Sequence, residues 1–97
     1  MKQAVRLENG SELLTSNEWQ ALRRQLALSP RELQVIQRIC DDEKEVGIAA
    51  NLGISVHTVH THIERIYRKL GVSSRCALVV RIFSRYLESI RPVRLAT

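Results

Sequence analysis

Apolar and polar residues follow the clearest repeating pattern between Ser55 and Leu70. Apolar residues recur there at steps of three and four positions, which at about 100° per residue places them on one stripe of a helix. The stripe comprises Val56, Val59, Ile63, Ile66 and Leu70. Ser55 stands where an N-cap residue belongs, and Gly71 stands where a helix commonly ends in a left-handed residue. We therefore expect a helix over residues 55–70 with one buried side.

The side of this helix opposite to the apolar stripe is polar and mostly basic. Five side chains project within roughly 50° of the direction opposite to the stripe axis. They are His57, Thr61, Glu64, Arg65 and Arg68. On a helix considered alone, such a face is most often only solvated surface. Its interpretation therefore depends on the sequence segments on either side of the helix.

A short helix is predicted immediately before this one. Residues 48–54 read IAANLGI, a pattern that favours a helix ending at Leu52 and broken at Gly53. A short helix, a tight turn with glycine and a longer capped helix together are typical of a helix-turn-helix. The second helix of that motif can enter the major groove of DNA by its N-terminal half. DNA binding is therefore the leading hypothesis for the polar face.

A helix with a capping box is predicted near the N-terminus. Thr15 and Glu18 fit the capping box, and the helix should continue to about Ala27. Its apolar side is formed by Trp19, Leu22 and Leu26. This side is expected to pack on the helices that follow.

The next helix has an equally clear start. Ser29 can cap it, Pro30 occupies the first helical position that proline prefers, and Glu32 lies near the positive end of the helix dipole. Its core stripe comprises Leu33, Ile36, Ile39 and Cys40.

Two features of the segment that follows carry weaker expectations. Asp42 and Glu45 can form a capping box for the short helix. Gly47 within that helix should cost about 1 kcal/mol relative to alanine. We expect the close approach of another backbone to explain this glycine.

The last helix should begin after Ser73 or Ser74 and reach about Ile90, because Pro92 prevents its continuation. Its apolar residues cover roughly 200° of the helix, about twice the stripe that a core-facing surface helix needs. Either the N-terminal segment or a second copy of the chain should cover the excess. We favour a homodimer, with an interface formed by Val79, Val80, Phe83 and Leu87.

The first fifteen residues allow several structures. Asn9-Gly10 favours a type I′ turn, which predicts a short hairpin with strands over residues 4–8 and 11–15. An isolated hairpin is marginal in water. A disordered segment, or an arm that reaches a neighbouring molecule, is the alternative.

Length and composition limit the possible classes of protein. Ninety-seven residues suffice for one domain with a modest core. No apolar run approaches the roughly eighteen residues that a membrane span requires, and the N-terminus lacks the apolar segment of a secretory signal. The expected location is the cytoplasm. The spacing of Cys40 and Cys76 fits neither a zinc site nor a redox pair, and we expect two buried thiols.

The charge is distributed unevenly along the chain. Residues 1–60 contain seven Lys or Arg and eight Asp or Glu, whereas residues 61–97 contain eight and two, a net charge of +6. A surface that meets phosphates and releases their counterions is expected to show such a basic concentration. An acidic protein or a membrane surface could also attract it.

These residues jointly resemble one family. The pattern covers about residues 28–83 and comprises Leu28-Ser29-Pro30-Arg31-Glu32, Ile48-Ala49, Leu52-Gly53-Ile54-Ser55, Thr58-Val59, His62, Ile66, and Lys69-Leu70-Gly71-Val72 with Ser74-Arg75. It is similar to LuxR-type (GerE-like) helix-turn-helix DNA-binding domains. Region 4 of sigma factors resembles it through the first two helices, but His62 and the sequence KLGVSSR favour the LuxR type.

The resemblance implies a fold and a function. The fold would be all-α, a four-helix helix-turn-helix bundle over residues 29–84. An extra N-terminal segment over 1–28 would hold a helix and a possible short hairpin, and 85–97 would hold the end of the last helix and a tail. The function would be that of a sequence-specific transcriptional regulator that binds double-stranded DNA as a dimer, with the 55–70 helix in the major groove.

The family is often regulated by a preceding receiver or ligand-binding domain, as in response regulators. Residues 1–28 are too few to form one. The chain is therefore expected to be a stand-alone regulator or a fragment of a longer one, with a signalling protein or domain upstream.

The resemblance also assigns roles to residues. The base-contacting residues would be His60, Thr61, Glu64, Arg65 and His57. By their position, the residues better placed to contact phosphates are Ser55, Thr58, Lys69, Ser74 and Arg75. Each of them could instead cap a helix or simply face solvent. For His62 we expect a hydrogen-bonded structural role at the boundary of core and groove.

The sequence departs from the family pattern at several positions. The family commonly has a glycine near Asp42, a Ser or Thr near Lys44, a glutamate at Gly47 and a lysine at His60. Replacement of that lysine matters most, because a neutral imidazole makes a weaker phosphate contact than an ammonium group.

Other functions find less support in the sequence. His57 and His60 are one turn apart, but without a third ligand nearby no metal or other cofactor is expected. No catalytic constellation is visible, so we expect no enzyme activity. The alternative function is that of a protein-interaction or adaptor module that keeps the helix-turn-helix fold without reading DNA.

Overall fold

The computed structural model describes residues 9–91, and every regular element among them is helical. A short 3₁₀ helix, η1 (Gly10–Leu13), precedes five α-helices. These are α1 (Ser16–Gln25), α2 (Pro30–Cys40), α3 (Glu45–Leu52), α4 (Val56–Leu70) and α5 (Arg75–Ile90). The expected all-α class is thereby confirmed.

Four of the five α-helices begin at the N-cap residues expected from the sequence. The expected capping box between Thr15 and Glu18 forms, and Ser29, expected as an N-cap, also forms a capping box with Glu32. Ser74 caps α5 by accepting a hydrogen bond from the N–H of Ala77. Gly71 adopts the left-handed conformation after α4, with φ of 68°. Local chemistry therefore fixes most helix boundaries.

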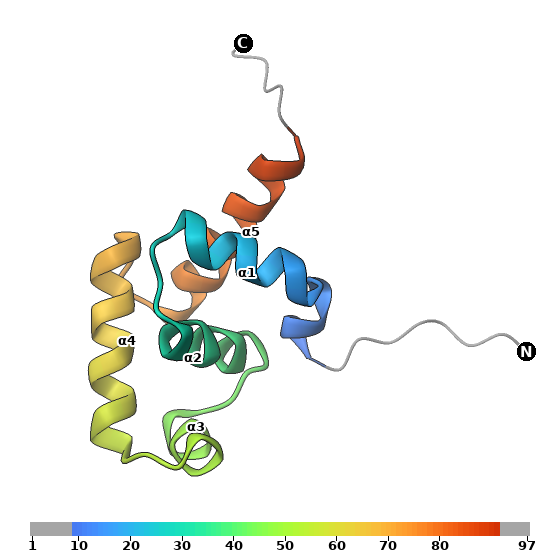
Figure 1. Ribbon diagram of the computed structural model, residues 1–97. Helices are drawn as coiled ribbons and strands as arrows, with labels where there is room; N and C mark the ends of the chain where they lie inside the picture. The colour runs from blue at the N-terminus through green and yellow to red at the C-terminus, as the bar shows by residue number, and fades with distance from the viewer. Residues whose placement is uncertain (1–8, 92–97) are drawn as a thin grey trace, which may run out of the picture.

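Helix α2 is the centre of the fold and contacts η1, α1, α4 and α5. In Figure 1, α4 stands along one side of α2, α3 lies beneath them, and α1 and α5 lie above. The side chains that are most completely buried come from four helices and form one core: Val35, Ile36, Ile48, Val59, Ile66, Leu78 and Ile82. None of the helices within residues 9–91 combines the length and the apolar character that a membrane crossing would need.

The second strand expected for the N-terminal hairpin does not form. Residues 4–8, the first expected strand, lie outside the described residues. Residues 11–13 of the second expected strand belong to η1 (Gly10–Leu13) instead. A Cβ atom at Gly10 would collide with the backbone carbonyl of Cys40 at the end of α2. The glycine therefore serves close packing against α2 and not a hairpin turn.

The expected cap of α3 is also wrong. Lys44 is the N-cap residue, and its side chain makes no capping hydrogen bond. Asp42 has a positive φ of 64°, a conformation in which glycine is favoured and Asp is tolerated. The family's usual glycine near this position thus has a backbone reason. A Cβ atom at Gly47 would meet no other atom within 4 Å, so no close backbone explains this glycine.

Helix α1 covers part of the excess apolar surface of α5. The rings of Trp19 and Phe83 meet edge to face, with centroids 6.2 Å apart. The hydroxyl of Tyr86 donates a hydrogen bond of 2.7 Å to Glu18. Val80 and Leu87 are still 59% and 39% exposed. Of the four residues expected at a dimer interface, the other two, Val79 and Phe83, are partly buried against the core of the protomer.

Candidate nucleic-acid interface

Helices α3 and α4 form the expected helix-turn-helix. Gly53 ends α3 in the left-handed conformation, with φ of 69°, and the N–H of Ile54 donates back to the carbonyl of Ala49. Ser55 then caps α4 by accepting a hydrogen bond of 3.0 Å from the N–H of Thr58. Because the turn is held at both ends, α3 fixes the direction in which α4 leaves the core.

One side of α4 is buried as predicted, with one exception. Val59, Ile63, Ile66 and Leu70 are buried. Val56 is 42% exposed, so its expected place in the buried stripe is wrong. It lies in the first turn of α4, where the neighbouring helices do not cover it.

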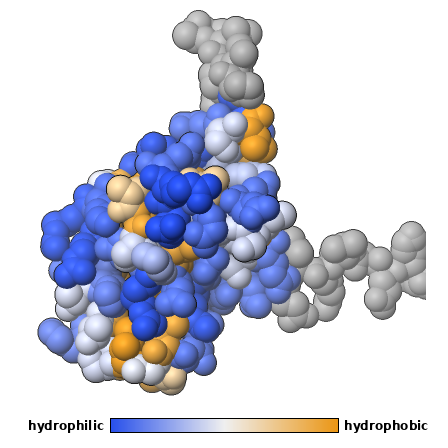
Figure 2. Space-filling view, viewed as in Figure 1, coloured by the Kyte–Doolittle hydropathy of each residue, from blue (hydrophilic) through white to orange (hydrophobic). Residues whose placement is uncertain are grey.

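All five predicted base-contacting residues lie on the exposed surface of α4. They are His57, His60, Thr61, Glu64 and Arg65. The hydroxyl of Thr61 donates to the carbonyl of His57 at 3.1 Å, one turn earlier. Figure 2 shows that the surface over α4 is mostly hydrophilic, whereas apolar residues gather over α3. The structure thus places these five side chains together and accessible.

His60 does not stand alone on this surface. Its Nε2 atom lies 3.2 Å from a carboxylate oxygen of Glu64, one turn later on α4. Its Nδ1 atom lies 3.6 Å from a carboxylate oxygen of Glu45, in the first turn of α3. Sequence reasoning considered Glu45 only as a capping residue. No periodicity could have revealed the contact, because the two residues belong to different helices.

The predicted phosphate-contacting hydroxyl groups have structural partners. The hydroxyl groups of Ser55 and Thr58 lie 2.8 Å apart in the cap of α4. Ser74 caps α5. All three lie at helix starts, where free backbone N–H groups and the positive end of the dipole favour an anion. Contact with phosphate stays a prediction for each of them.

The ammonium group of Lys69 is paired with groups of the same protomer. Its ammonium group donates to the carbonyl of Ala27 and to the carboxylate of Glu32, each at 2.8 Å. Burial acts to raise the pKa of Glu32, but the hydrogen bonds from Lys69 and from the N–H of Ser29 outweigh it and hold the pKa below its usual value. A phosphate contact by Lys69 would compete with this ion pair.

Arg75 has a similar internal role. Its guanidinium donates to the carbonyl of Glu43 at 2.7 Å. The carboxylate of Glu43 pairs with Arg38 at 3.0 Å and accepts from Asn51 at 2.9 Å. These contacts tie the loop before α3 to both α2 and α5. The phosphate contact expected of Arg75 stays a prediction.

His62 lacks the hydrogen bond expected of it. Its Nδ1 atom is buried and has no hydrogen-bond partner among residues 9–91. The ring is half-buried on α4. The predicted hydrogen-bonded role is therefore wrong for this nitrogen.

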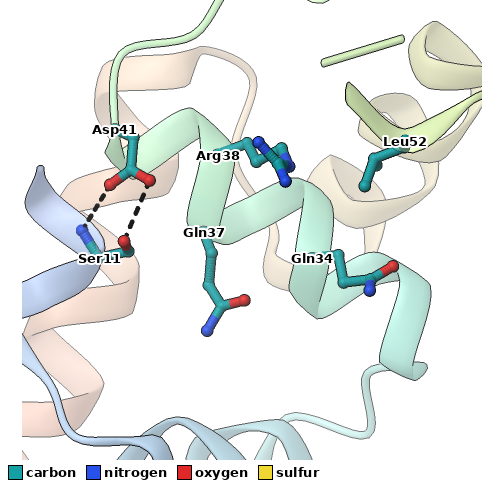
Figure 3. Close-up of a pocket in the computed structure, with 6 residues that line it drawn as sticks. All are labelled: Ser11, Gln34, Gln37, Arg38, Asp41 and Leu52. Carbon is teal, nitrogen blue, oxygen red and sulfur yellow. Dashed lines mark hydrogen bonds between the residues drawn. The ribbon is translucent and has the colours of Figure 1, made fainter. Parts of the chain in front are cut away.

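A polar hollow of about 320 Å³ is lined by residues of η1, α2 and the end of α3 (Figure 3). It is lined by Ser11, Gln34, Gln37, Arg38, Asp41 and Leu52. Asp41 accepts hydrogen bonds from the N–H and the hydroxyl of Ser11, at 2.8 and 3.0 Å. Arg38 is paired with Glu43. The charged groups of the hollow thus join η1 and the loop before α3 to α2.

The cysteines differ from each other. Burial, and secondarily the charge of Asp41, raise the pKa of Cys40 to about 12, so its thiol stays protonated. Cys76 is exposed, and the expectation that it is buried is wrong. Within residues 9–91 no group of three His, Cys, Asp or Glu side chains is arranged to hold a metal ion.

Comparison with known proteins now identifies the family. Residues 26–82, more than half of the chain, match the family model described as bacterial regulatory proteins of the luxR family. The chain belongs to the LuxR family. The matched range includes α2, α3 and α4 and the first half of α5, so it contains the whole helix-turn-helix.

Individual relatives of this LuxR-family chain are named as transcriptional regulators. The probable transcriptional regulatory protein NarL of Mycobacterium tuberculosis (strain H37Rv) is 48% identical over 52 residues, which cover 54% of this chain and 24% of the relative. The transcriptional regulatory protein UhpA of Escherichia coli (strain K12) is 42% identical over 60 residues, covering 62% and 31%. The chain therefore spans less than a third of the length of these relatives. No solved structure matches the chain.

The matched family is described as bacterial regulatory proteins, and these relatives are named as transcriptional regulatory proteins. The match begins after α1, which packs on α2 and α5 through residues outside the matched range. Trp19 and Leu22 of α1 are buried in the same core. The hydrogen bond from the Trp19 indole to the carbonyl of Ser11, at 2.8 Å, connects η1 to this helix.

Proposed function

We propose that the chain is a sequence-specific transcriptional regulator that binds double-stranded DNA as a dimer, with α4 in the major groove. The observation that carries this proposal is the exposure of His57, Thr61 and Arg65 on one face of a capped second helix of a helix-turn-helix. Arg can bridge O6 and N7 of guanine, and the Thr methyl group can pack on a thymine methyl group. The expected cytoplasmic location and an upstream signalling protein or domain belong to the same proposal.

Charge supports DNA as the partner. Arg65 and Arg68 are exposed on α4, and neither forms an ion pair within residues 9–91. Residues 61–97 carry a net charge of +6. Arginine and lysine side chains neutralise DNA phosphates and release their counterions. In a plot of the logarithm of the binding constant against the logarithm of salt concentration, each phosphate contact contributes about −0.9 to the slope.

Selection of binding sites from random duplex DNA tests this function. We expect an enriched sequence made of two half-sites about one helical turn apart, as a dimer with two reading helices requires. Affinity for the selected site should fall steeply between about 50 and 200 mM salt. Failure to enrich any sequence, or affinity independent of salt, would contradict the proposal.

Arg65 is the sharpest test within the proposal. If its guanidinium reads a base, Arg65→Ala should weaken binding to the selected site by about 1 to 3 kcal/mol and relax the preference at one base pair. Arg68→Ala is the matched control on the same helix. It should weaken binding to all sequences alike and lower the salt slope by about 1. Equal loss for all sequences in Arg65→Ala would assign Arg65 to phosphate instead.

A specific observation also favours the alternative of a protein-interaction module. Two predicted phosphate-contacting cations, Lys69 and Arg75, are engaged within the protomer, and the exposed face of α4 carries the Glu64 carboxylate. A partner protein that requires Val80, combined with absent DNA binding, would support this alternative.

A further inference from the structure

A cluster of three side chains joins α3 to the exposed face of α4. The imidazole of His60 lies between Glu45 of α3 and Glu64 of α4, at 3.6 Å from one carboxylate oxygen and 3.2 Å from the other. α3 packs directly against α4, so the cluster spans a fixed contact between two helices (Figure 1). All three side chains keep substantial exposure, since 37% to 55% of each is accessible.

This arrangement limits what His60 can contact. An imidazole has two ring nitrogens, and here each of them faces a carboxylate oxygen. For a ring nitrogen to reach a base or a phosphate, it would have to leave one of these carboxylates. The ring is therefore placed to hold other side chains and not to contact DNA itself.

The same arrangement leaves Glu64 with a free acceptor. Its Oε2 atom faces His60, and among residues 9–91 its Oε1 atom has no hydrogen-bond partner. An unrestrained carboxylate on a DNA-facing surface is repelled by phosphates and loses rotamer freedom when it binds. Contact with His60 reduces the second effect, because the neighbouring ring restricts the rotamers of the Glu64 side chain before it binds. The amino group at N4 of cytosine is the base edge that a carboxylate accepts from in the major groove.

We propose that Glu64 reads a cytosine amino group and that His60, held from α3 by Glu45, is the positioning residue for Glu64. This inference rests on the proposed function, because it requires α4 to enter the major groove. His60 and Glu64 were both expected from the sequence to contact bases, and the inference gives them different roles. It also adds Glu45 to the residues that determine specificity.

The experiment measures base preference at each position of the DNA site selected by the unaltered chain. Four variants are compared on duplexes with single base-pair changes: Glu64→Gln, His60→Ala, Glu45→Gln and His57→Ala. Glu64→Gln should lower the preference for cytosine on the order of 10-fold at one position. His60→Ala and Glu45→Gln should relax the same position, by about 3-fold, and leave the salt slope unchanged.

The control and the double variant separate positioning from a general structural effect. His57→Ala removes the same type of side chain from the same face, but His57 forms no ion pair with Glu45 or Glu64 within residues 9–91. Any change in base preference that it causes should therefore fall at a different position of the site. When His60→Ala is added to Glu64→Gln, the base preference at the cytosine position should not change further. His60 is expected to affect that preference only by positioning Glu64. Circular dichroism should show the helical content of each variant to be unchanged, as expected for exposed positions.

Three results would overturn the inference while leaving the proposed function intact. His60→Ala could relax a different position, which would make His60 a base contact. It could weaken all sequences alike and lower the salt slope by about 1, which would make it a phosphate contact. Glu64→Gln could leave the cytosine preference unchanged. In contrast, absence of sequence-selective binding by the unaltered chain would overturn the proposed function itself.

Discussion

For individual residues, local sequence patterns predict which side chains are exposed but not which distant groups they pair with. The exposure of Thr61, Glu64 and Arg65 follows from helical periodicity, and the structure agrees. The partners of Lys69 and Arg75 lie 37 and 32 positions away in the chain, so no local pattern could reveal them. Such long-range contacts depend on how the helices pack, and they decide whether a cation is available to DNA.

The ion pair of Glu32 and Lys69 should make stability depend on pH. Because the folded-state pKa of Glu32 lies below its usual value, about 4.5, the ionised form favours folding. The stabilisation is therefore complete above that value and is lost as pH falls through the folded pKa. Glu32→Gln should lower the free energy of unfolding at pH 7 by about 1 to 3 kcal/mol, and the difference from the unaltered chain should shrink below pH 4.

Urea unfolding at pH 7 and at pH 3 measures the difference in free energy of unfolding between Glu32→Gln and the unaltered chain. Glu12→Gln is the matched control, since Glu12 is exposed and, among residues 9–91, its carboxylate accepts only a 3.3 Å hydrogen bond from Asn9. It should change stability by less than about 0.5 kcal/mol at either pH. A constant difference between Glu32→Gln and the unaltered chain down to pH 3 would contradict the electrostatic explanation.

The two thiols should react at different rates. Cys76 is exposed, whereas burial raises the pKa of Cys40 to about 12. Because the thiolate is the reactive form, a disulfide reagent at pH 8 should modify one thiol rapidly and the second only slowly. In urea both should react rapidly. Rapid reaction of both thiols in the folded protein would show that the end of α2 opens readily.

At the scale of elements, helix boundaries were predictable because their signals are local. The caps at Thr15, Ser29 and Ser55 require only residues within one turn, and all three form. The hairpin expectation failed because the role of Gly10 depends on the distant carbonyl of Cys40. The expected cap of α3 failed because Asp42 adopts a left-handed backbone conformation. The only sign of this in the sequence comparison was the glycine that the family commonly has near this position.

Two glycines should respond in opposite directions to replacement by alanine. Gly47 lies within α3 with open space around it, so Gly47→Ala should stabilise the protein by about 0.5 to 1 kcal/mol through higher helix propensity. Gly53 has φ of 69°, and Gly53→Ala should destabilise it by about 1 kcal/mol. Thermal unfolding of both variants measures this contrast. Destabilisation by Gly47→Ala would show that the glycine has a packing role.

At the scale of the whole molecule, α1 changes how the last helix can be used. Trp19 covers Phe83, and Glu18 binds the hydroxyl of Tyr86. Val80 and Leu87 are still accessible. A dimer formed through α5 would therefore use the side of the helix that α1 does not cover, and only part of the interface expected from sequence is available.

Val80 tests the proposed dimer. Val80→Lys places a charge on the exposed side of α5 without disturbing the core, because Val80 is 59% exposed. Sedimentation should show that the variant is monomeric at concentrations where the unaltered chain is dimeric. Affinity for a site with two half-sites should fall, while binding to a single half-site is unchanged. Identical sedimentation of both proteins would contradict an α5 interface.

The central claim is that the exposed face of α4 meets DNA, and nuclear magnetic resonance tests it most directly. Backbone amide signals of the chain would be followed during titration with the selected duplex. The largest shift changes should fall on residues 55–65, with smaller ones at the ends of α3 and α5. Largest changes on α1 and on the exposed side of α5, with α4 unaffected, would contradict the claim.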